Sequence, residues 1–307
     1  MRLRAALLAT SPIAMSAASE PAIWVMVNGL PGAMGREIAS AALRRGLRLA
    51  PFALTGPGCG CEALCDDARG GAPVSVRLYE PADRDALAAR LAAFPRLIAV
   101  DFTHPSSVNA NAAWYAASGL PFVMGTTGGD RAALLRDATA SGCYAVIAPN
   151  MSKQIVALQA AITRMAEEFP ASFAGCELSV VESHQSSKAD TSGTAKAVAD
   201  QLALLCGAPF DHDAIVRVRD PAAQLAGGGP AHGGVSPVPE AALAGHAFHT
   251  YSLKSDGLEV QIRHNISGRA TYAEGAIDAV QFLARQIAAS SEQKIFSMID
   301  VLRRGGM

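Results

Sequence analysis

Residues 182–195 bring a histidine, a lysine and several small polar residues together in one segment, Glu-Ser-His-Gln-Ser-Ser-Lys-Ala-Asp-Thr-Ser-Gly-Thr-Ala. His184 can donate a proton near neutral pH, because the pKa of an unperturbed imidazole is about 6.5. Lys188 can pair with an anion, and Glu182 or Asp190 could orient either side chain. A polar turn before an N-capped helix would have a similar composition. The segment therefore indicates acid–base chemistry when a cofactor site accompanies it.

The turn Ser192-Gly193-Thr194 opens a predicted helix and offers free backbone amides. Such a turn holds a carboxylate through its N–H groups and the helix dipole. Lys188, in the same loop, supplies a point charge for a second carboxylate. The two features together could hold a carboxylate and a second negative charge of one small ligand.

A glycine-rich turn joins a predicted strand, residues 23–27, to a predicted helix, residues 35–45. Its Gly-x-x-Gly-x-x-Gly pattern lets the backbone turn tightly and approach a pyrophosphate at the helix N-terminus. A turn without a ligand is the alternative in a chain that contains 28 glycines. The flanking strand and helix favour dinucleotide binding by Gly29, Leu30, Pro31, Gly32, Ala33, Met34 and Gly35.

The second strand ends at Thr55-Gly56, where an acidic residue would favour an unphosphorylated adenosine ribose. No carboxylate stands there to repel a 2′-phosphate. We therefore expect NADPH to be used at least as well as NADH, and Asp in place of Thr55 to shift the preference toward NADH. Candidate 2′-phosphate partners, which can also be ordinary solvated helix charges, are Arg36, Arg44 and Arg45.

Strands and helices alternate through residues 20–152, which is typical of an α/β fold with a doubly wound parallel sheet. We expect this part to be the dinucleotide-binding domain, with loops at Gly29, Asp101 and Gly125 converging beyond the carboxyl ends of the strands. The predicted strands are residues 23–27, 47–54, 97–100, 122–124 and 144–147, and the predicted helices are residues 35–45, 83–94, 108–118 and 131–141.

Residues 153–269 are predicted to form a smaller α+β domain for substrate binding and oligomerisation. Residues 220–239 are rich in Gly and Pro and predict a loop or insertion. Residues 270–307 are predicted to return to the first domain. The predicted elements are helices at 153–168, from 192 onward, 273–287 and 293–302, and strands at 177–181, 246–253 and 258–265.

The composition is that of a globular protein of about two domains: 307 residues, 50% hydrophobic, 17% charged, net charge -1. No basic excess is present for nucleic acid, and no apolar run is long enough to span a membrane. The scattered cysteines suggest reduced thiols. Cys59, Cys61 and Cys65 lack a second ligand pair or a nearby histidine, so we favour a surface loop over a metal clip and predict no metal site.

Residues 1–19 contain Arg2 and Arg4, many Ala and Ser, and no acidic residue. This composition is typical of an organellar transit peptide, which would place the protein in a plastid. A disordered N-terminus of a cytoplasmic protein is the alternative.

Together, these motifs resemble the dihydrodipicolinate reductase family, in its plant-type branch, over residues 23–302. The resemblance implies NAD(P)H-dependent reduction of 4-hydroxy-tetrahydrodipicolinate to tetrahydrodipicolinate in lysine biosynthesis through diaminopimelate. It is carried, in family order, by Asn-Gly-Leu-Pro-Gly-Ala-Met-Gly (28–35), Asp-Phe-Thr-His-Pro (101–105), Gly-Thr-Thr-Gly (125–128), Ala-Pro-Asn-Met (148–151) and the segment 182–195.

By this resemblance His184 is the proton donor and Lys188 the catalytic lysine. The implied cofactor contacts are residues 29–35, Thr55, Phe102, Gly125, Thr126, Thr127, Ala148, Pro149, Asn150 and Met151. The implied substrate contacts are Thr127, Gln185, Lys188, Ser192, Gly193 and Thr194.

The chain departs from the bacterial pattern of the family at two points. Gln185 stands where the bacterial pattern has a second histidine, so it can donate a hydrogen bond but no charge. A Pro and one further residue before the Ser192 turn are missing. The rival functions are another two-domain dehydrogenase of the homoserine or aspartate type, and a non-catalytic dinucleotide sensor. A homo-oligomer, dimer or tetramer, is expected.

Overall fold

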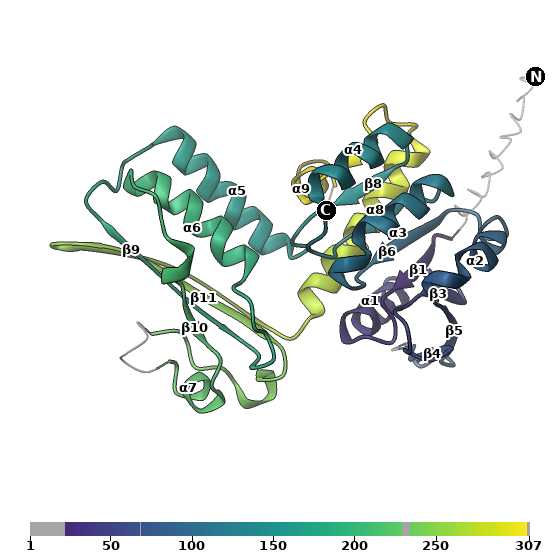
Figure 1. The fold of residues 1–307 in the computed structure, drawn as a ribbon, viewed down its shortest axis with the longest axis horizontal. Coiled ribbons are helices and arrows are strands. Elements are labelled where there is room, and N and C mark those ends of the chain that lie inside the picture. The colour runs from purple at the N-terminus through teal and green to yellow at the C-terminus, as the bar shows by residue number, and fades with distance from the viewer. Residues whose placement is uncertain (1–21, 68, 229–233, 306–307) are drawn as a thin grey trace, which may run out of the picture.

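The computed structural model describes residues 22–67, 69–228 and 234–305, so the expectations for residues 1–19 lie outside the described residues. The described chain forms two lobes, each around its own main sheet (Figure 1). The first lobe holds a fully parallel six-stranded sheet in the order β13-β8-β7-β6-β1-β2. Its strands are β1 (Trp24–Asn28), β2 (Arg48–Leu49), β6 (Leu97–Asp101), β7 (Phe122–Met124), β8 (Ala145–Ile147) and β13 (Ile295–Phe296).

Helices cover this sheet with the apolar faces that their sequence spacing predicts. Helix α1 (Ala33–Arg44) buries Ile38, Ala42 and Leu43, and the chain turns away at Gly46, whose φ is 75°. Residues from the C-terminal part of the chain share the same hydrophobic core. The other helices of this lobe are α2 (Arg84–Leu91), α3 (Val108–Ala117), α4 (Arg131–Ser141), α8 (Ala270–Ala288) and α9 (Met298–Arg304).

The second lobe contains a four-stranded sheet in the order β10-β9-β11-β12. Strand β10 runs parallel to β9, and β11 runs antiparallel to both β9 and β12. Helices α5 and α6 pack on this sheet around a second core (Figure 1). The elements are β9 (Glu177–His184), β10 (Val216–Val218), β11 (His246–Ser255), β12 (Leu258–Ser267), α5 (Lys153–Glu168), α6 (Gly193–Cys206) and the short α7 (Pro221–Leu225).

Some sequence-based expectations about local structure are wrong. The strand expected at residues 47–54 breaks at Pro51 into β2 and β3 (Phe52–Leu54). Strand β3 joins a separate small sheet with β4 (Glu62–Cys65) and β5 (Val74–Tyr79), which puts Cys65 on a strand, where it is buried, and not in a surface loop. The segment 220–239 includes α7 and is not wholly irregular.

The helix expected at residues 293–302 is also wrong in its first half. Residues Ile295–Phe296 form β13, which pairs with β8 at the edge of the parallel sheet. Helix α9 starts only at Met298, because Ser297 and Asp300 form a capping box that fixes its first turn. A hydrogen-bond cap thus overrides the apolar pattern that suggested one continuous helix.

The chain crosses between the lobes near Met151 and again near Arg269 (Figure 1). Helix α8 lies directly against the first crossing. A Cβ atom at Gly275 would stand 1.7 Å from the Met151 carbonyl oxygen, so only glycine fits there. The two crossings are therefore packed side by side.

Candidate functional site

The glycine-rich turn is shaped by backbone contacts that exclude any side chain. Gly29 has a φ of 100°, and a Cβ atom there would meet the Phe102 carbonyl oxygen at 2.3 Å. Gly35, in the first turn of α1, lies against the backbone of Gly29 and Leu30. Gly32 caps α1 without a side-chain hydrogen bond, which leaves the first amides of the helix without a side-chain acceptor.

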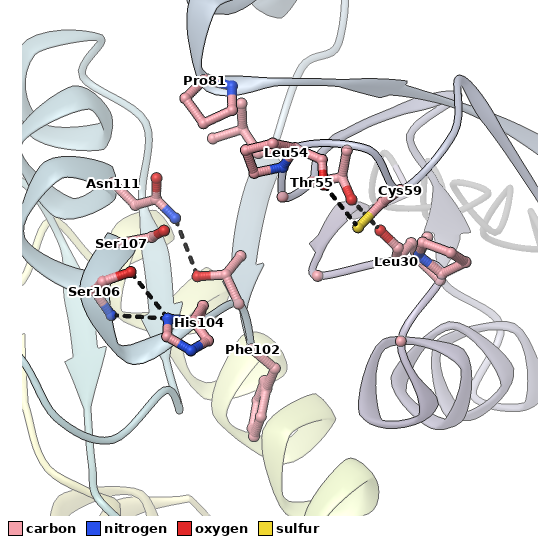
Figure 2. Close-up of a pocket in the computed structure, with 16 residues that line it drawn as sticks. Leu30, Leu54, Thr55, Cys59, Pro81, Phe102, His104, Ser106, Ser107 and Asn111 are labelled. Atoms are coloured by element: carbon pink, nitrogen blue, oxygen red, sulfur yellow. Dashed lines mark hydrogen bonds between the residues drawn. The ribbon is translucent and has the colours of Figure 1, made fainter.

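A cavity of about 460 Å³ opens beside this turn (Figure 2). Thr55 and Cys59 stand on one side of it, and His104 and Asn111 stand on the other. Its walls fit a dinucleotide, because glycine backbone and helix amides can approach phosphates closely. The lining residues are Gly29, Leu30, Pro31, Gly32, Leu54, Thr55, Gly56, Pro57, Cys59, Pro81, Phe102, Thr103, His104, Ser106, Ser107 and Asn111.

Sequence reasoning named only part of this lining. It missed His104, Ser106, Ser107 and Asn111, although the first of these belongs to the quoted motif at residues 101–105. Other expected cofactor residues lie outside the cavity: Ala33, Met34, Gly35, Gly125, Thr126, Thr127, Ala148, Pro149, Asn150 and Met151.

Asp101 explains why the loops after β1, β6 and β7 meet as expected. Its carboxylate is fully buried and accepts hydrogen bonds from Tyr115 (2.6 Å), Thr126 (2.7 Å) and Asn111 (2.9 Å). Tyr115 in turn accepts a 2.7 Å bond from the Asn28 side chain, which ends β1. Burial, together with the Asp101 charge, raises the pKa of Tyr115 well above its usual range. Thr126 therefore has a supporting role in this structure and does not face the cavity.

The three arginines considered as phosphate partners are occupied elsewhere. Arg36 donates to the carbonyls of Pro31 and Leu64. Arg44 and Arg45 form ion pairs with acidic side chains of α8, at N···O distances of 2.7 Å and 2.9 Å for the shortest contacts. They join α1 to α8, and no lysine or arginine is among the residues that line the cavity.

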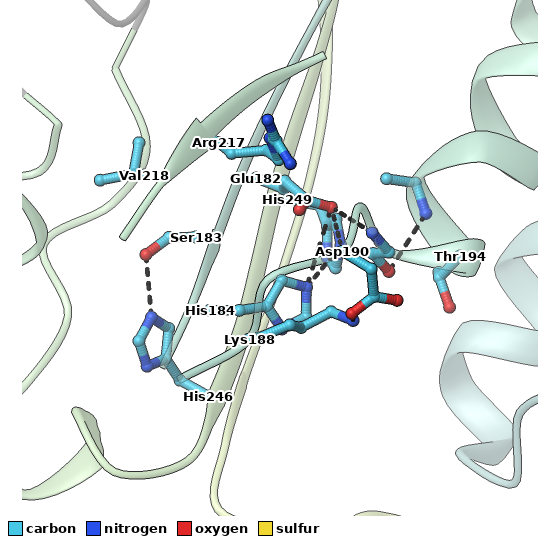
Figure 3. A network of polar contacts seen from close by, with 12 residues as sticks. Glu182, Ser183, His184, Lys188, Asp190, Thr194, Arg217, Val218, His246 and His249 are labelled. Carbon is cyan, nitrogen blue, oxygen red and sulfur yellow. Dashed lines mark hydrogen bonds and ion pairs between the residues drawn. The ribbon is translucent and has the colours of Figure 1, made fainter. Parts of the chain in front are cut away.

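A second polar cluster lies in the other lobe, where β9 ends at His184 (Figure 3). Glu182 is fully buried. Its Oε2 accepts a hydrogen bond from the Ser192 amide at 2.9 Å, and its Oε1 is bound by the Arg219 guanidinium. Arg219 also donates to the Lys188 carbonyl at 2.8 Å. A buried carboxylate and one arginine thus fix both ends of the loop that carries Lys188.

His184 lies against a second buried histidine, His249 of β11, with 3.3 Å between their Nε2 atoms. Burial, followed by the charges of Arg219 and Lys188, lowers the pKa of His184 to about 3. Burial also lowers the pKa of His249 well below its usual range. Both rings are therefore neutral in the ligand-free protein at neutral pH.

Lys188 and the turn at Ser192 lie at the rim of this cluster. The Lys188 ammonium donates to Asp190 at 2.7 Å, and that carboxylate is largely exposed to solvent. Gly193 is exposed, whereas Thr194 accepts a 3.2 Å hydrogen bond from Asn150 of the first lobe. Gln185 is half-buried in the same loop. The loop thus combines a cation paired with an exposed acid and a helix N-terminus that the Ser192 side chain caps by accepting from the Ala195 amide at 3.4 Å.

Glu182, His184 and His249 are also the one group, among the described residues, whose ligand atoms lie close enough to surround a metal ion. We assign no metal to it. The carboxylate is already held by Arg219 and the Ser192 amide, and the two positive charges of Arg219 and Lys188 oppose a further cation.

Sequence reasoning missed His249, Arg219 and Gln224. Gln224 is buried and donates to the carbonyls of His184 (2.7 Å) and Val218 (3.1 Å). A signal for His249 exists only in the strand register, where it is paired with Glu182.

A parallel-sheet lobe with a glycine-turn cavity, joined to a lobe with a buried histidine and a loop lysine, defines a two-domain nucleotide-dependent oxidoreductase. The family model "Dihydrodipicolinate reductase, N-terminus" matches residues 23–151, and "Dihydrodipicolinate reductase, C-terminus" matches residues 155–302. The chain belongs to the dihydrodipicolinate reductase family.

Individual relatives agree with this assignment. The "Probable 4-hydroxy-tetrahydrodipicolinate reductase 2, chloroplastic" of Oryza sativa subsp. japonica is 44% identical over 95% of this chain and 88% of its own length. The 4-hydroxy-tetrahydrodipicolinate reductase of Rubrobacter xylanophilus is 30% identical over 91% of this chain and 98% of its own. A dipicolinate-bound dihydrodipicolinate reductase from Paenisporosarcina sp. TG-14 shares the fold, with a TM-score of 0.60 at 17% identity, over 90% of this chain and 98% of its own.

Proposed function

We propose that this protein reduces 4-hydroxy-tetrahydrodipicolinate to tetrahydrodipicolinate with NAD(P)H, in lysine biosynthesis through diaminopimelate. The observation that carries the substrate choice is the loop after β9, which places Lys188 and the turn 192–194 beside His184. These are two separate holders for two carboxylates and one proton donor.

The glycine turn and the cavity beside it would hold the dinucleotide, which supplies a hydride when it is bound. Lys188 would exchange its partner Asp190 for one substrate carboxylate, and the amides of Gly193 and Thr194 would bind the other. The reaction also takes up a proton, which His184 delivers to the substrate carbon, and releases water.

Substrate binding is also expected to raise the pKa of His184. In the ligand-free protein the charges of Arg219 and Lys188 help to keep its pKa low. A bound carboxylate adds a negative charge next to Lys188, which raises the pKa of His184 and favours its protonated form. Substrate binding thus moves His184 toward the protonated form that donates the proton.

The two half-sites belong to different lobes, since the residues lining the cofactor cavity all come from the first lobe. We propose that the lobes close on the ligands and exclude water, with the crossings near Met151 and Arg269 as hinge. The expected contacts of Gly125, Thr127 and Asn150 would form in that closed state. We propose residues 20–152 as the dinucleotide-binding domain, residues 153–269 as the substrate and oligomerisation domain, and residues 270–307 as the return to the first domain.

The direct test is oxidation of NADPH in a coupled assay with freshly made substrate. Pyridine-2,6-dicarboxylate, a flat mimic that cannot be reduced, should compete with the substrate, and pyridine-2-carboxylate should bind poorly. Lys188→Ala should weaken the dicarboxylate at least tenfold. Equal binding of the two pyridines, or turnover of homoserine or aspartate semialdehyde instead, would refute the proposed function.

For the cofactor, we propose that NADPH is used at least as well as NADH. Neither a carboxylate that would select against the 2′-phosphate nor a cation that would bind it is among the cavity-lining residues. A weak preference is therefore expected. The ratio of kcat/KM for the two cofactors measures it, and a strong preference for NADH would contradict it.

We also propose a homo-oligomer, a dimer or a tetramer, and a plastid location. Strand β12 lies at the edge of its sheet and offers unpaired backbone groups for a second copy. Light scattering of the purified protein tests the oligomer proposal.

No helix among the described residues is long and apolar enough to cross a membrane. The support for a plastid location is the word "chloroplastic" in the name of the rice relative. Import of the full chain into isolated chloroplasts tests it.

A further inference from the structure

Two histidines meet in the buried cluster, yet the reaction requires only one proton donor. His249 projects from β11 opposite Glu182 of β9, and its side chain is 2% exposed. Its Nε2 lies 3.3 Å from Nε2 of His184, and Glu182 Oε2 is 3.9 Å from both nitrogens (Figure 3). The three groups form a closed triangle, with His184 at the corner nearest to Lys188 and the substrate loop.

The stability of the fold does not explain why a histidine stands at this position. Nδ1 of His249 is buried and has no hydrogen-bond partner among the described residues. An unpartnered polar atom in a core costs free energy, and an apolar side chain of similar shape would avoid that cost. The polar contact that distinguishes His249 is the one from its Nε2 to His184.

The contact has a definite direction once His184 carries a proton. A protonated imidazole has an N–H on both ring nitrogens and can accept nothing. Its Nε2 must then donate, and the neutral Nε2 of His249 is the acceptor at that position. A hydrogen bond from a charged donor is about twice as strong as one between neutral groups. This acceptor therefore stabilises the protonated form of His184, in which Nε2–H is held by His249 and the Nδ1 proton is the one left for delivery.

We propose that His249 is a positioning residue: it fixes the His184 ring through the Nε2–Nε2 hydrogen bond and accepts that bond when His184 is protonated. The role corresponds to that of the carboxylate behind the histidine in a serine hydrolase triad, with a neutral imidazole in place of the acid. The proposal rests on the proposed function, because it takes His184 as the proton donor.

Other titratable and charged groups surround the pair, and they define the controls. The His264 ring of β12 lies against the His249 ring at 4.6 Å between centroids, tilted by 34°, and no hydrogen bond joins it to His184 among the described residues. It is the matched control, since it is a partly buried imidazole that contacts the His249 ring without bonding to His184. The groups that face the pair are Glu182 from β9, Lys188 from the loop, Arg219 after β10, His246 and Tyr251 from β11 and His264 from β12.

The test compares His249→Leu, His249→Gln and His264→Leu in the full-length protein. We expect His249→Leu to fold with unchanged thermal stability and to lose about tenfold to a hundredfold in kcat, with KM and the Kd for pyridine-2,6-dicarboxylate changed less than about threefold. Without the acceptor, the His184 proton is lost at lower pH, so the high-pH fall of kcat should move down by about one unit. His249→Gln keeps an acceptor and should stay within about fivefold of the wild type. His264→Leu should behave like the wild type.

A second measurement separates this proposal from the proposed function. In ¹⁵N spectra of the histidine rings of the ligand-free protein, His249→Leu should shift the Nε2 signal of His184, and His264→Leu should not. A wild-type protein that does not oxidise NADPH with the substrate refutes the proposed function, whereas an unshifted His184 signal refutes the pairing. Normal kcat in His249→Leu, or a His249→Gln variant as slow as His249→Leu, overturns the positioning role.

Discussion

Replacing Arg219 should destabilise the second lobe and detach the substrate loop, because this guanidinium is the partner of a carboxylate with no access to water. Glu182 has 0% exposed side chain, and Arg219 has 18%. Removing one partner of a buried ion pair costs about 3–5 kcal/mol, since the other charge remains desolvated. The partial exposure of Arg219 places the expected loss for Arg219→Met near the lower end, about 3 kcal/mol.

A double-mutant cycle can separate the loss of stability from the loosening of the loop that carries Lys188. Glu182→Gln removes the buried charge, so Arg219→Met combined with it should recover most of the lost stability. The weaker binding of ligand by the loop that carries Lys188 should remain in the double mutant. Arg219 also donates to the carbonyl of Lys188 at 2.8 Å and to that of Asp190 at 3.3 Å, so both variants that lack it should bind pyridine-2,6-dicarboxylate more weakly than the wild type.

Arg217 provides the matched control, two residues earlier. It also donates to a carbonyl of this loop, that of Ala189 at 3.1 Å, but it is exposed and has no ion pair with Glu182. Arg217→Met should change the stability by less than about 0.5 kcal/mol.

The assay must report on the second lobe. The chain's two tryptophans, Trp24 and Trp114, lie in the first lobe, so their fluorescence does not report on unfolding of the second lobe. Hydrogen exchange of β9 amides under native conditions measures the local free energy of opening instead. A loss below about 1 kcal/mol for Arg219→Met, or an equal loss for Arg217→Met, would refute the buried ion-pair argument.

Three further predictions follow from the site. His184→Ala should lower kcat by about a hundredfold or more with little change in the Kd for pyridine-2,6-dicarboxylate, because a proton donor acts in the transition state; near-normal turnover would remove it from the mechanism. Gly56→Asp should shift the cofactor preference toward NADH. The sequence pointed to Thr55 for this substitution, but Asp there should disrupt the turn, because the buried Thr55 hydroxyl donates to the Leu30 carbonyl at 2.6 Å, whereas a Cβ at Gly56 meets only Cys59 Sγ at 3.7 Å. Unfolding by urea should become easier below about pH 6.5, where the unfolded chain binds protons. The folded chain does not bind them there, because burial lowers the pKa of His184 to about 3 and of His264 to about 4. Equal stability at pH 7.5 and pH 5 would contradict the last expectation.

The sequence was sufficient for the elements whose signals are local. The strand, glycine turn and helix around Gly29 follow from apolar spacing and from glycines that no other residue can replace there. The histidine and lysine of residues 182–195 stand in one segment, so their chemistry could be considered together. Where a local signal competed with a hydrogen-bond cap, as at Ser297, the apolar pattern gave the wrong element.

The partners that complete the site have no such local signal. His249 comes from β11 and Arg219 from the residue after β10, both far along the chain, and only the register between β9 and β11 sets His249 opposite Glu182. A one-residue slip would turn that ring to the other face of the sheet. Likewise, Thr126 belongs to a conspicuous glycine-threonine turn, but its hydroxyl is bound to Asp101 inside the fold. Burial decides such roles, and burial depends on tertiary packing.

A fully buried carboxylate organises each half of the site. Asp101 in the first lobe and Glu182 in the second are both fully buried carboxylates, and each binds groups from several chain segments. A desolvated charge holds its donors strongly, because losing any one of them leaves it uncompensated. The cofactor loops and the substrate loop are therefore each tied to a buried carboxylate. The movement that we propose to bring hydride donor and proton donor together is therefore assigned to the crossings near Met151 and Arg269, where Gly275 of α8 packs against the Met151 carbonyl.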